Sequence, residues 1–140
     1  MLIQYSKIII YIRYDTLIEK PMKTLILNID RDDDFGRKAK VKSPIVGLKK
    51  NVEAANKLGE VDPEDSDLNA IFYAISIYKK LKNEGKDVEV ATLCGNISVG
   101  LKSDEIISAQ LEEVIELSKA DDVILISDGA EDEYILPIVQ

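Results

Sequence analysis

Short apolar runs alternate with segments of helical periodicity along this chain. The apolar runs have the length and composition of strands that are buried on both faces, and they occupy residues 24–29, 87–94 and 123–126. Apolar residues repeat every three or four positions in the segments 48–58, 68–81 and 103–115. This alternation predicts an α/β fold, a Rossmann-like three-layer α/β/α arrangement with a mainly parallel sheet.

Capping residues predict where the helices begin and end. Gly59 and Gly85 stand where a glycine commonly follows the last turn of a helix. Asp62, directly before a proline, is expected to cap the longest helix, and Ser103 is expected to cap the next one. Phe72 belongs to the apolar positions that we expect on the buried face of the longest helix.

The chain divides into an extension and one domain. Residues 1–21 contain a short β-prone patch and are interpreted as an N-terminal extension, either an edge strand or disordered. The Rossmann-like domain is expected over residues 22–140, where the apolar run begins directly after Met22. Residues 134–140 begin another element without a cap, so we expect the domain to be truncated at its C-terminus.

Composition excludes several classes of function. The 26 acidic and 18 basic residues give a formal net charge of −8, which argues against a nucleic-acid-binding surface. The absence of histidine excludes His-assisted serine or cysteine catalysis and zinc sites that need imidazole. Cys94 is the single cysteine, is interpreted as a small buried hydrophobe, and fits a reducing cytoplasmic setting. No run approaches the roughly 18 apolar residues of a membrane span, so we expect no membrane insertion by this chain.

Two carboxylate clusters follow predicted strands. The first contains Asp30, Asp32, Asp33 and Asp34, and the second, after the last strand, contains Asp128, Glu131, Asp132 and Glu133. A parallel sheet brings the carboxyl ends of its strands to one edge, where ligands bind in such folds. Clustered carboxylates repel one another unless solvent, basic side chains or a hard cation relieve them. We therefore predict a Mg²⁺ or Mn²⁺ site from Asp30, Asp32, Asp33, Asp128, Glu131 and Asp132. The alternative is a solvated acidic loop, with the second cluster forming a turn and a helix start.

A phosphate-binding role is predicted for basic and glycine-rich segments. Arg37 begins a stretch with several lysines and no acidic residue as far as Lys50. The segment from Gly95 to Ser103 resembles a phosphate-cradling loop, but an inserted leucine separates it from the P-loop pattern. Backbone N–H groups at such a turn bind anions, so Arg37, Gly95, Gly100, Lys102 and Ser103 are candidates for a phosphorylated ligand. The alternative is an ordinary connection between strand and helix.

Three motifs in the same order resemble a known family. They are Ile29-Asp30-Arg31-Asp32-Asp33-Asp34-Phe35-Gly36-Arg37-Lys38-Ala39, Asp62-Pro63-Glu64-Asp65-Ser66-Asp67-Leu68-Asn69-Ala70 and Ser127-Asp128-Gly129-Ala130-Glu131-Asp132-Glu133-Tyr134. The chain from about Met22 to Gln140 is similar to an archaeal family of uncharacterised proteins, domain of unknown function family 373. The resemblance implies a fragment or short version of a membrane-associated protein, because members are typically longer and carry predicted membrane helices. It brings no established activity, so no catalytic role is transferred.

The sequence supports two main functional hypotheses. The first is a cytoplasmic domain that binds a divalent metal and a phosphorylated ligand and, if it is an enzyme, catalyses metal-dependent phosphoryl transfer or hydrolysis. The second is a non-enzymatic sensor or interaction module of a membrane-associated protein. A dinucleotide-binding oxidoreductase is a weaker alternative, because no G-x-G-x-x-G follows the first domain strand.

Overall fold

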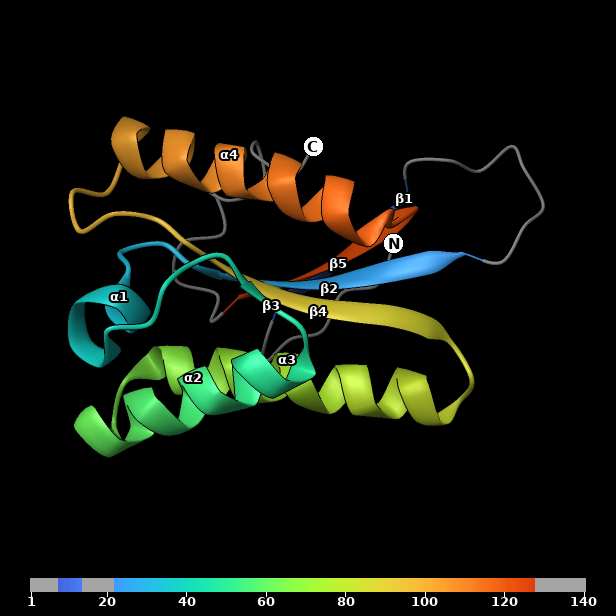
Figure 1. Ribbon diagram of the computed structural model, residues 1–140, viewed down its shortest axis with the longest axis horizontal. Coiled ribbons are helices and arrows are strands. Elements are labelled where there is room, and N and C mark those ends of the chain that lie inside the picture. The colour runs from blue at the N-terminus through green and yellow to red at the C-terminus, as the bar shows by residue number, and fades with distance from the viewer. Residues whose placement is uncertain (1–7, 14–21, 128–140) are drawn as a thin grey trace.

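The computed structural model describes residues 8–13 and 22–127, which form a mixed five-stranded sheet between two layers of helices (Figure 1). The strand order is β1-β5-β2-β4-β3. The elements, in chain order, are β1 (Ile8–Arg13), β2 (Lys23–Asp30), α1 (Asp34–Ala39), β3 (Ile45–Val46), α2 (Leu48–Val61), α3 (Ser66–Asn83), β4 (Asp87–Cys94), α4 (Leu101–Ser118) and β5 (Asp122–Ser127). The predicted Rossmann-like α/β fold with a mainly parallel sheet is confirmed.

The central strand β2 fixes where the candidate site lies. It runs parallel to β4 on one side and to β5 on the other, while β1 and β3 are antiparallel edge strands. The register places Asp30 opposite Cys94, so β2 and β4 end at the same edge of the sheet. This is the carboxyl edge, where open α/β sheets bind ligands.

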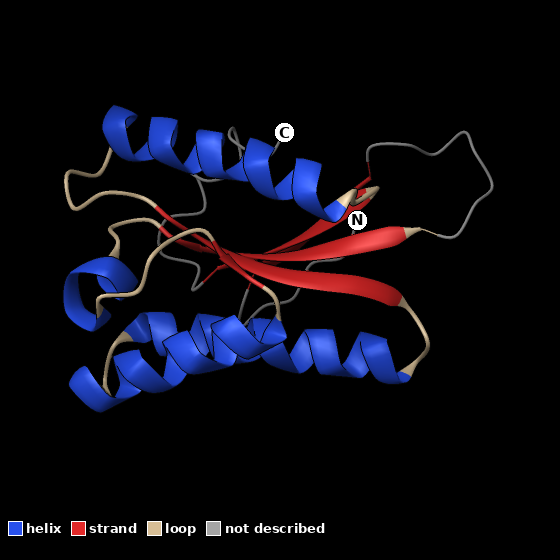
Figure 2. Cartoon of the chain, viewed as in Figure 1, coloured by secondary structure: helices blue, strands red, loops and turns tan. Residues whose placement is uncertain are grey.

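The two faces of the sheet pack against different helices, as the cartoon shows (Figure 2). Alternate residues of a strand point to opposite faces. Leu25 and Leu27 of β2 pack in one cluster with Ile107 of α4, and Ile26 packs in another with Ala74 of α3. Helices α2 and α3 lie below the sheet and α4 lies above it, so the buried strand β2 is covered on both faces.

Several helix boundaries differ from the prediction. Helix α2 continues through Gly59 to Val61, and Asp62 is its C-cap, so Asp62 is not the N-cap of α3. That role belongs to Asp65, whose carboxylate accepts a hydrogen bond from the Asp67 N–H at 2.9 Å. The proline after Asp62 lies in the turn between the two helices and not in the first turn of α3. Gly85, with a φ of 82°, follows α3 as predicted.

Two further expectations about side chains were wrong. Phe72 is 47% exposed, because the buried face of α3 consists of Ala70, Ile71, Ala74 and Ile75. Helix α4 begins at Leu101, two residues before the predicted cap, and Ser103 lies buried in its first turn. The sequence also gave no sign of α1, whose residues were read as a basic loop, or of the two-residue strand β3.

The N-terminal extension contributes β1, which pairs antiparallel with β5 along the sheet edge. Residues 1–7, 14–21 and 128–140 lie outside the described part of the chain, and so does the element predicted over 134–140. Among the described helices, none is both long and apolar enough to cross a membrane.

Candidate metal centre

Asp30 is the last residue of β2 and the most deeply placed carboxylate of the site. Only 1% of its surface is exposed. Its two carboxylate oxygens accept hydrogen bonds from the backbone N–H groups of Asp34, at 3.1 Å, and Phe35, at 2.9 Å. Burial raises the pKa of Asp30 to about 7, although these two hydrogen bonds oppose the shift. The carboxyl group is therefore held at the start of α1 and is poised to change its charge near neutral pH.

The turn after β2 is shaped by Asp33, the N-cap of α1. Its backbone is left-handed, with a φ of 61°, and its carboxylate accepts a hydrogen bond from the Gly36 N–H at 3.0 Å. A Cβ at Gly36 would overlap that carboxylate, so the cap requires glycine there. Asp33 thus serves α1 locally, while its neighbours Asp32 and Asp34 join Asp30 in a cluster.

Asp67, in the first turn of α3, completes this cluster from a distant part of the chain. One carboxylate oxygen from each of four residues lies within 4.8 Å of the others, and these residues are Asp30, Asp32, Asp34 and Asp67, which we call the carboxylate cluster. Burial, followed by the charge of Asp30, raises the pKa of Asp67 to about 10. The four groups cannot all ionise together without a compensating positive charge.

Two basic side chains border the carboxylate cluster. The Arg37 guanidinium pairs with Asp34 and lies 3.8 Å from Asp32. Lys38 reaches past the cluster to α3 and donates hydrogen bonds of 2.8 Å to Asp62 and Asp65. Arg37 is therefore already bound to carboxylates, and Lys38 fastens α1 to the turn before α3.

A second group of ligand atoms joins Asp30 and Asp33 to the thiol of Cys94, again within 4.8 Å of one another. Cys94 is 1% exposed and packs in the core cluster with Phe35 and Ala39, as expected for a buried hydrophobe. Burial raises the pKa of its thiol well above the usual range. The protonated thiol is a poor metal ligand, so the oxygen-only carboxylate cluster is the better candidate.

The glycine-containing segment from Gly95 to Ser103, after β4, contacts the turn after β2 that carries the carboxylate cluster. Ser103 donates a hydrogen bond of 2.6 Å to the Arg31 carbonyl and accepts one of 3.2 Å from the Asn96 N–H. A Cβ at Gly95 would overlap both Ser103 Oγ and that carbonyl. Gly100 has a φ of 111° before α4, and Lys102 is exposed on its first turn. Gly95 and Ser103 are therefore packed inside the protein. Lys102 is the charged, solvent-exposed residue of this segment.

A buried chain of polar side chains lies on the same face of the sheet as Asp30. Asn28 donates to Thr92 Oγ1 at 3.2 Å, and Thr92 donates to Asn51 Oδ1 at 2.6 Å. Asn28 Oδ1 is buried and accepts no hydrogen bond from the described residues. Asn28 is two positions before Asp30 in β2, so both side chains leave the strand on the same face.

The structure brings together part of the predicted metal set. Asp30 lies with Asp32 in the carboxylate cluster and with Asp33 in the group that contains Cys94. Asp128, Glu131 and Asp132 lie outside the described residues. Two members of the carboxylate cluster, Asp34 and Asp67, were not among the predicted ligands. For Asp67 the signal was the run of acidic residues before α3, which helix capping explained equally well.

Comparison with known proteins places the chain among uncharacterised relatives. A protein of Archaeoglobus fulgidus is 51% identical over 117 residues, which cover 84% of this chain and 34% of the relative. A protein of Methanocaldococcus jannaschii is 44% identical over 117 residues, with 83% and 32% covered. The chain thus spans about a third of the length of these curated relatives. Residues 23–140 match a family described as a domain of unknown function, DUF373. No solved structure matches the chain.

Proposed function

The chain belongs to the DUF373 family, and on that premise we propose that its domain binds a divalent cation, Mg²⁺ or Mn²⁺, at the carboxylate cluster. Asp30, Asp32, Asp34 and Asp67 supply the ligands. Asp128, the residue that follows β5 in the sequence, is a further candidate. The observation that carries the proposal is the approach of four carboxylate oxygens to within 4.8 Å of one another at the carboxyl end of β2.

The donor set fits a hard cation. All four side chains offer carboxylate oxygens, which are the ligands that Mg²⁺ and Mn²⁺ prefer. The buried Asn28 Oδ1, which lacks a donor among the described residues, adds an acceptor on the same face of β2. Burial and mutual repulsion raise the pKa of Asp30 to about 7 and that of Asp67 to about 10, and a bound cation would offset both effects.

A phosphorylated ligand is the substrate class that this centre suits. When bound, a divalent metal polarises a phosphoryl oxygen and lowers the pKa of coordinated water. The residues of this chain hold the ligands in place: Asp33 caps α1, and the backbone N–H groups of Asp34 and Phe35 orient Asp30. If the domain is an enzyme, the reaction is metal-dependent phosphoryl transfer or hydrolysis. A carboxylate then takes the role of general base, because the chain contains no histidine.

A second candidate function is that of a non-enzymatic sensor or interaction module. The observation that favours it is the set of exposed apolar side chains after β4, where Ile97, Val99 and Leu101 are 58%, 50% and 76% exposed. These residues follow Gly95 in the sequence, and the Gly95 N–H donates a hydrogen bond of 2.8 Å to the main-chain carbonyl of Asp30. Exposed apolar side chains that lie close together are typical of a surface that meets another protein.

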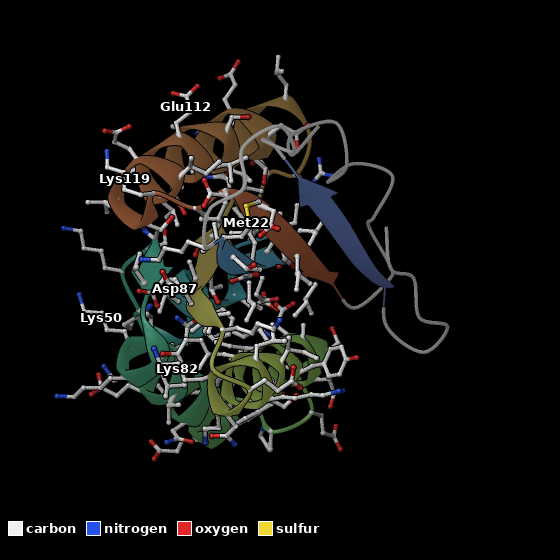
Figure 3. The ribbon with its side chains drawn as sticks, turned by 90° about the vertical axis from the view of Figure 1, so that its right-hand side faces the viewer. Met22, Lys50, Lys82, Asp87, Glu112 and Lys119 are labelled. Carbon is white, nitrogen blue, oxygen red and sulfur yellow. The ribbon has the colours of Figure 1, made fainter. Side chains whose placement is uncertain are left out.

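Calorimetric titration of the chelator-stripped protein with Mg²⁺ and Mn²⁺ tests the metal site. We expect saturable binding that weakens at least about tenfold in Asp32→Asn/Asp67→Asn, because both substitutions remove ligand charge. The matched control is Asp87→Asn/Glu112→Gln, which removes two carboxylates at the far end of β4 and on α4, as Figure 3 shows. The control should bind metal as the wild type does.

The outcomes separate the two functions. No binding at millimolar metal by a protein with a native circular dichroism spectrum would rule out the metal site. Equal weakening in both double variants would show that overall charge and not the cluster attracts the ion. Metal binding with hydrolysis of a phosphorylated substrate supports the enzyme, whereas metal binding that only changes the affinity for a protein partner supports the sensor. An Asp128→Asn variant reports whether that residue is a ligand.

A further inference from the structure

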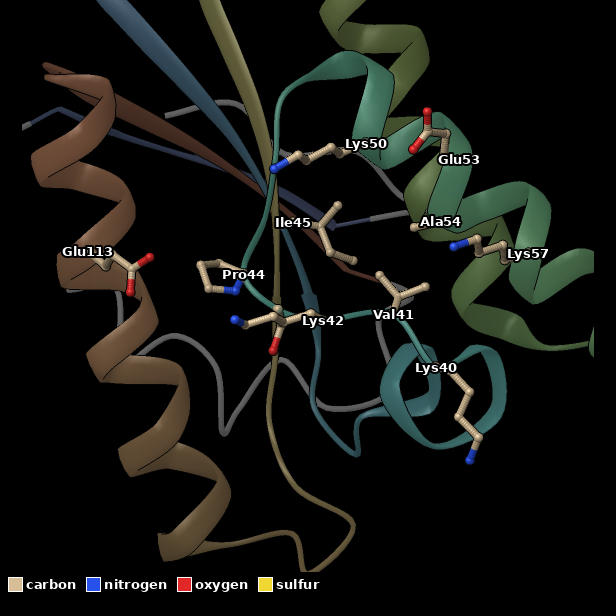
Figure 4. Close-up of a pocket in the computed structure, with 11 residues that line it drawn as sticks. Lys40, Val41, Lys42, Pro44, Ile45, Lys50, Glu53, Ala54, Lys57 and Glu113 are labelled. Atoms are coloured by element: carbon tan, nitrogen blue, oxygen red, sulfur yellow. The ribbon is translucent and has the colours of Figure 1, made fainter.

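A cavity of about 580 Å³ opens on the flank of the molecule beside the edge strand β3 (Figure 4). Its walls are the segment between α1 and β3, the outer side of α2 and one residue of α4. The lining residues are Lys40, Val41, Lys42, Ser43, Pro44, Ile45, Lys50, Glu53, Ala54, Lys57 and Glu113. None of them belongs to the carboxylate cluster. The volume lies within the range of about 300–1,000 Å³ that is usual for small-molecule pockets.

Positive charge predominates at this cavity, although the whole chain carries a formal net charge of −8. Four lysines and two glutamates line it. Lys40 donates a hydrogen bond to the Arg37 carbonyl at 3.1 Å. Among the described residues, Lys42, Lys50 and Lys57 form no ion pair with a carboxylate. In Figure 4 the Lys57 side chain points towards Val41 and Ile45. The Lys50 side chain passes above Ile45, and the Lys40 side chain points away from the other lining residues. The four lysines thus outnumber the two glutamates of the lining, which leaves an excess of positive charge at the cavity.

The chemistry of the lining selects a class of ligand. The cationic side chains of the lining are all lysines, which bind phosphate groups as compact point charges. Val41, Pro44, Ile45 and Ala54 form an apolar part of the wall, and Ser43 and two glutamates complete the lining. An anion with an organic part would place its charges on the lysines and its apolar atoms on this wall.

We propose that this cavity is a second ligand site, which binds a small organic phosphate independently of the carboxylate cluster. The cavity begins at Lys40, directly after α1, whereas the cluster lies at the start of α1. The two sites therefore share α1 but no ligand. A competing explanation is that the lysines and Pro44 simply protect the open edge of β3 from pairing with other chains. In that case the lysines would have no preferred ligand.

Calorimetric titration in the presence of a chelator tests the proposal, with pyrophosphate and ADP as probes and citrate as a non-phosphate anion. We expect saturable binding of pyrophosphate, tighter binding of ADP, and a loss of at least about tenfold in Lys42→Gln/Lys50→Gln/Lys57→Gln, because charge-assisted contacts to phosphate are lost. The matched control is Lys79→Gln/Lys80→Gln/Lys82→Gln on α3, which removes the same charge from exposed positions outside the cavity.

Four results would overturn the proposal. The first three are no saturable binding of either phosphate probe, an equal loss in both triple variants, and citrate binding as tight as that of pyrophosphate. Asp32→Asn/Asp67→Asn should bind pyrophosphate as the wild type does in chelator. Loss of binding in that variant would place the anion at the carboxylate cluster and would also overturn the proposal. Because phosphate binding is measured in chelator, a negative result for this cavity is distinguishable from a negative result for the metal site.

Discussion

Ser103 of α4 donates a hydrogen bond of 2.6 Å to the main-chain carbonyl of Arg31, in the turn that carries the carboxylate cluster. Both residues are buried, and the Arg31 guanidinium forms an ion pair of 2.7 Å with Asp104, the next residue of α4. The N-terminal turn of α4 therefore holds the turn after β2 in place.

Replacing Ser103 by alanine should destabilise the protein. The change removes a buried donor from the Arg31 carbonyl and an acceptor from the Asn96 N–H, so we expect a loss of about 1–3 kcal/mol in the free energy of unfolding. Urea denaturation measures it. Ser76→Ala is the control, because that hydroxyl also bonds to a backbone carbonyl, of Tyr73, but is exposed, and its effect should stay within about 0.5 kcal/mol. Equal losses in the two variants would contradict the assigned role of Ser103.

Two glycines should respond to alanine in opposite directions. At Gly95 a Cβ would overlap Ser103 Oγ and the Arg31 carbonyl, and since the carbonyl belongs to the backbone the turn must shift. We expect Gly95→Ala to cost about 1–3 kcal/mol. Gly59 lies inside α2, where a Cβ would make only ordinary contacts of 3.8 Å with Leu68. Gly59→Ala should stabilise by about 0.5–1 kcal/mol. Thermal unfolding of the two variants measures whether each substitution lowers or raises the stability.

The metal-free protein should become less stable as the pH rises. The pKa of Asp30 is raised from 3.8 to about 7 and that of Asp67 from 3.8 to about 10, so the folded state binds more protons than the unfolded state over these windows. The free energy of unfolding therefore falls from about pH 4 upward, by an amount on the order of a few kcal/mol.

Guanidinium titrations in chelator at several pH values measure this dependence. Asp67→Asn should flatten the profile above neutral pH, because the group that still holds its proton there is removed. Saturating Mg²⁺ should raise the stability most at high pH, where the competing protons are gone. A wild-type profile that is flat, or that rises with pH, would contradict the charge assignment of the cluster.

Cys94 should be unreactive in the folded protein. Its thiol is buried beside Asp30 and Asp33, and its pKa is raised, so little thiolate forms at mildly alkaline pH. We expect an aromatic disulfide reagent to label it only after denaturation in guanidinium. A fast reaction under native conditions would show that the centre of the site opens to solvent.

The parallel core of the fold was predictable because its strands are continuous apolar runs. The strand Asp87–Cys94 was predicted with its observed ends, and β2 differs by one residue at each end. Helix α1 was not predictable in this way, because its six residues contain a single pair of apolar residues at helical spacing, Phe35 and Ala39. Its first turn is stabilised instead by the Asp33 cap and by the Asp30 carboxylate, which are contacts that depend on the end of β2.

The sequence predicted the part of the candidate site that follows β2 but not the part that α3 contributes. Asp30 and Asp32 follow a buried strand, and that position alone indicated a ligand-binding edge. Asp67 lies 37 residues after Asp30, in a helix start where an acidic residue is common for local reasons. Only the packing of α3 against β2, through Ala74 and Ile26, brings its carboxylate to the strand end. Such an approach is a property of tertiary structure, which a local pattern does not encode.

The central position of β2 also constrains the order in which this protein folds. The ribosome makes β2 before either of its parallel partners, yet Asn28 bonds to Thr92, 64 positions later in the sequence, and Thr24 bonds to Asp122, 98 positions later. Closing such long loops costs chain entropy before the new contacts repay it. Both edges of the central strand β2 therefore stay unpaired until β4 and β5 have been made. We expect slow refolding and aggregation of shortened chains that end before β5.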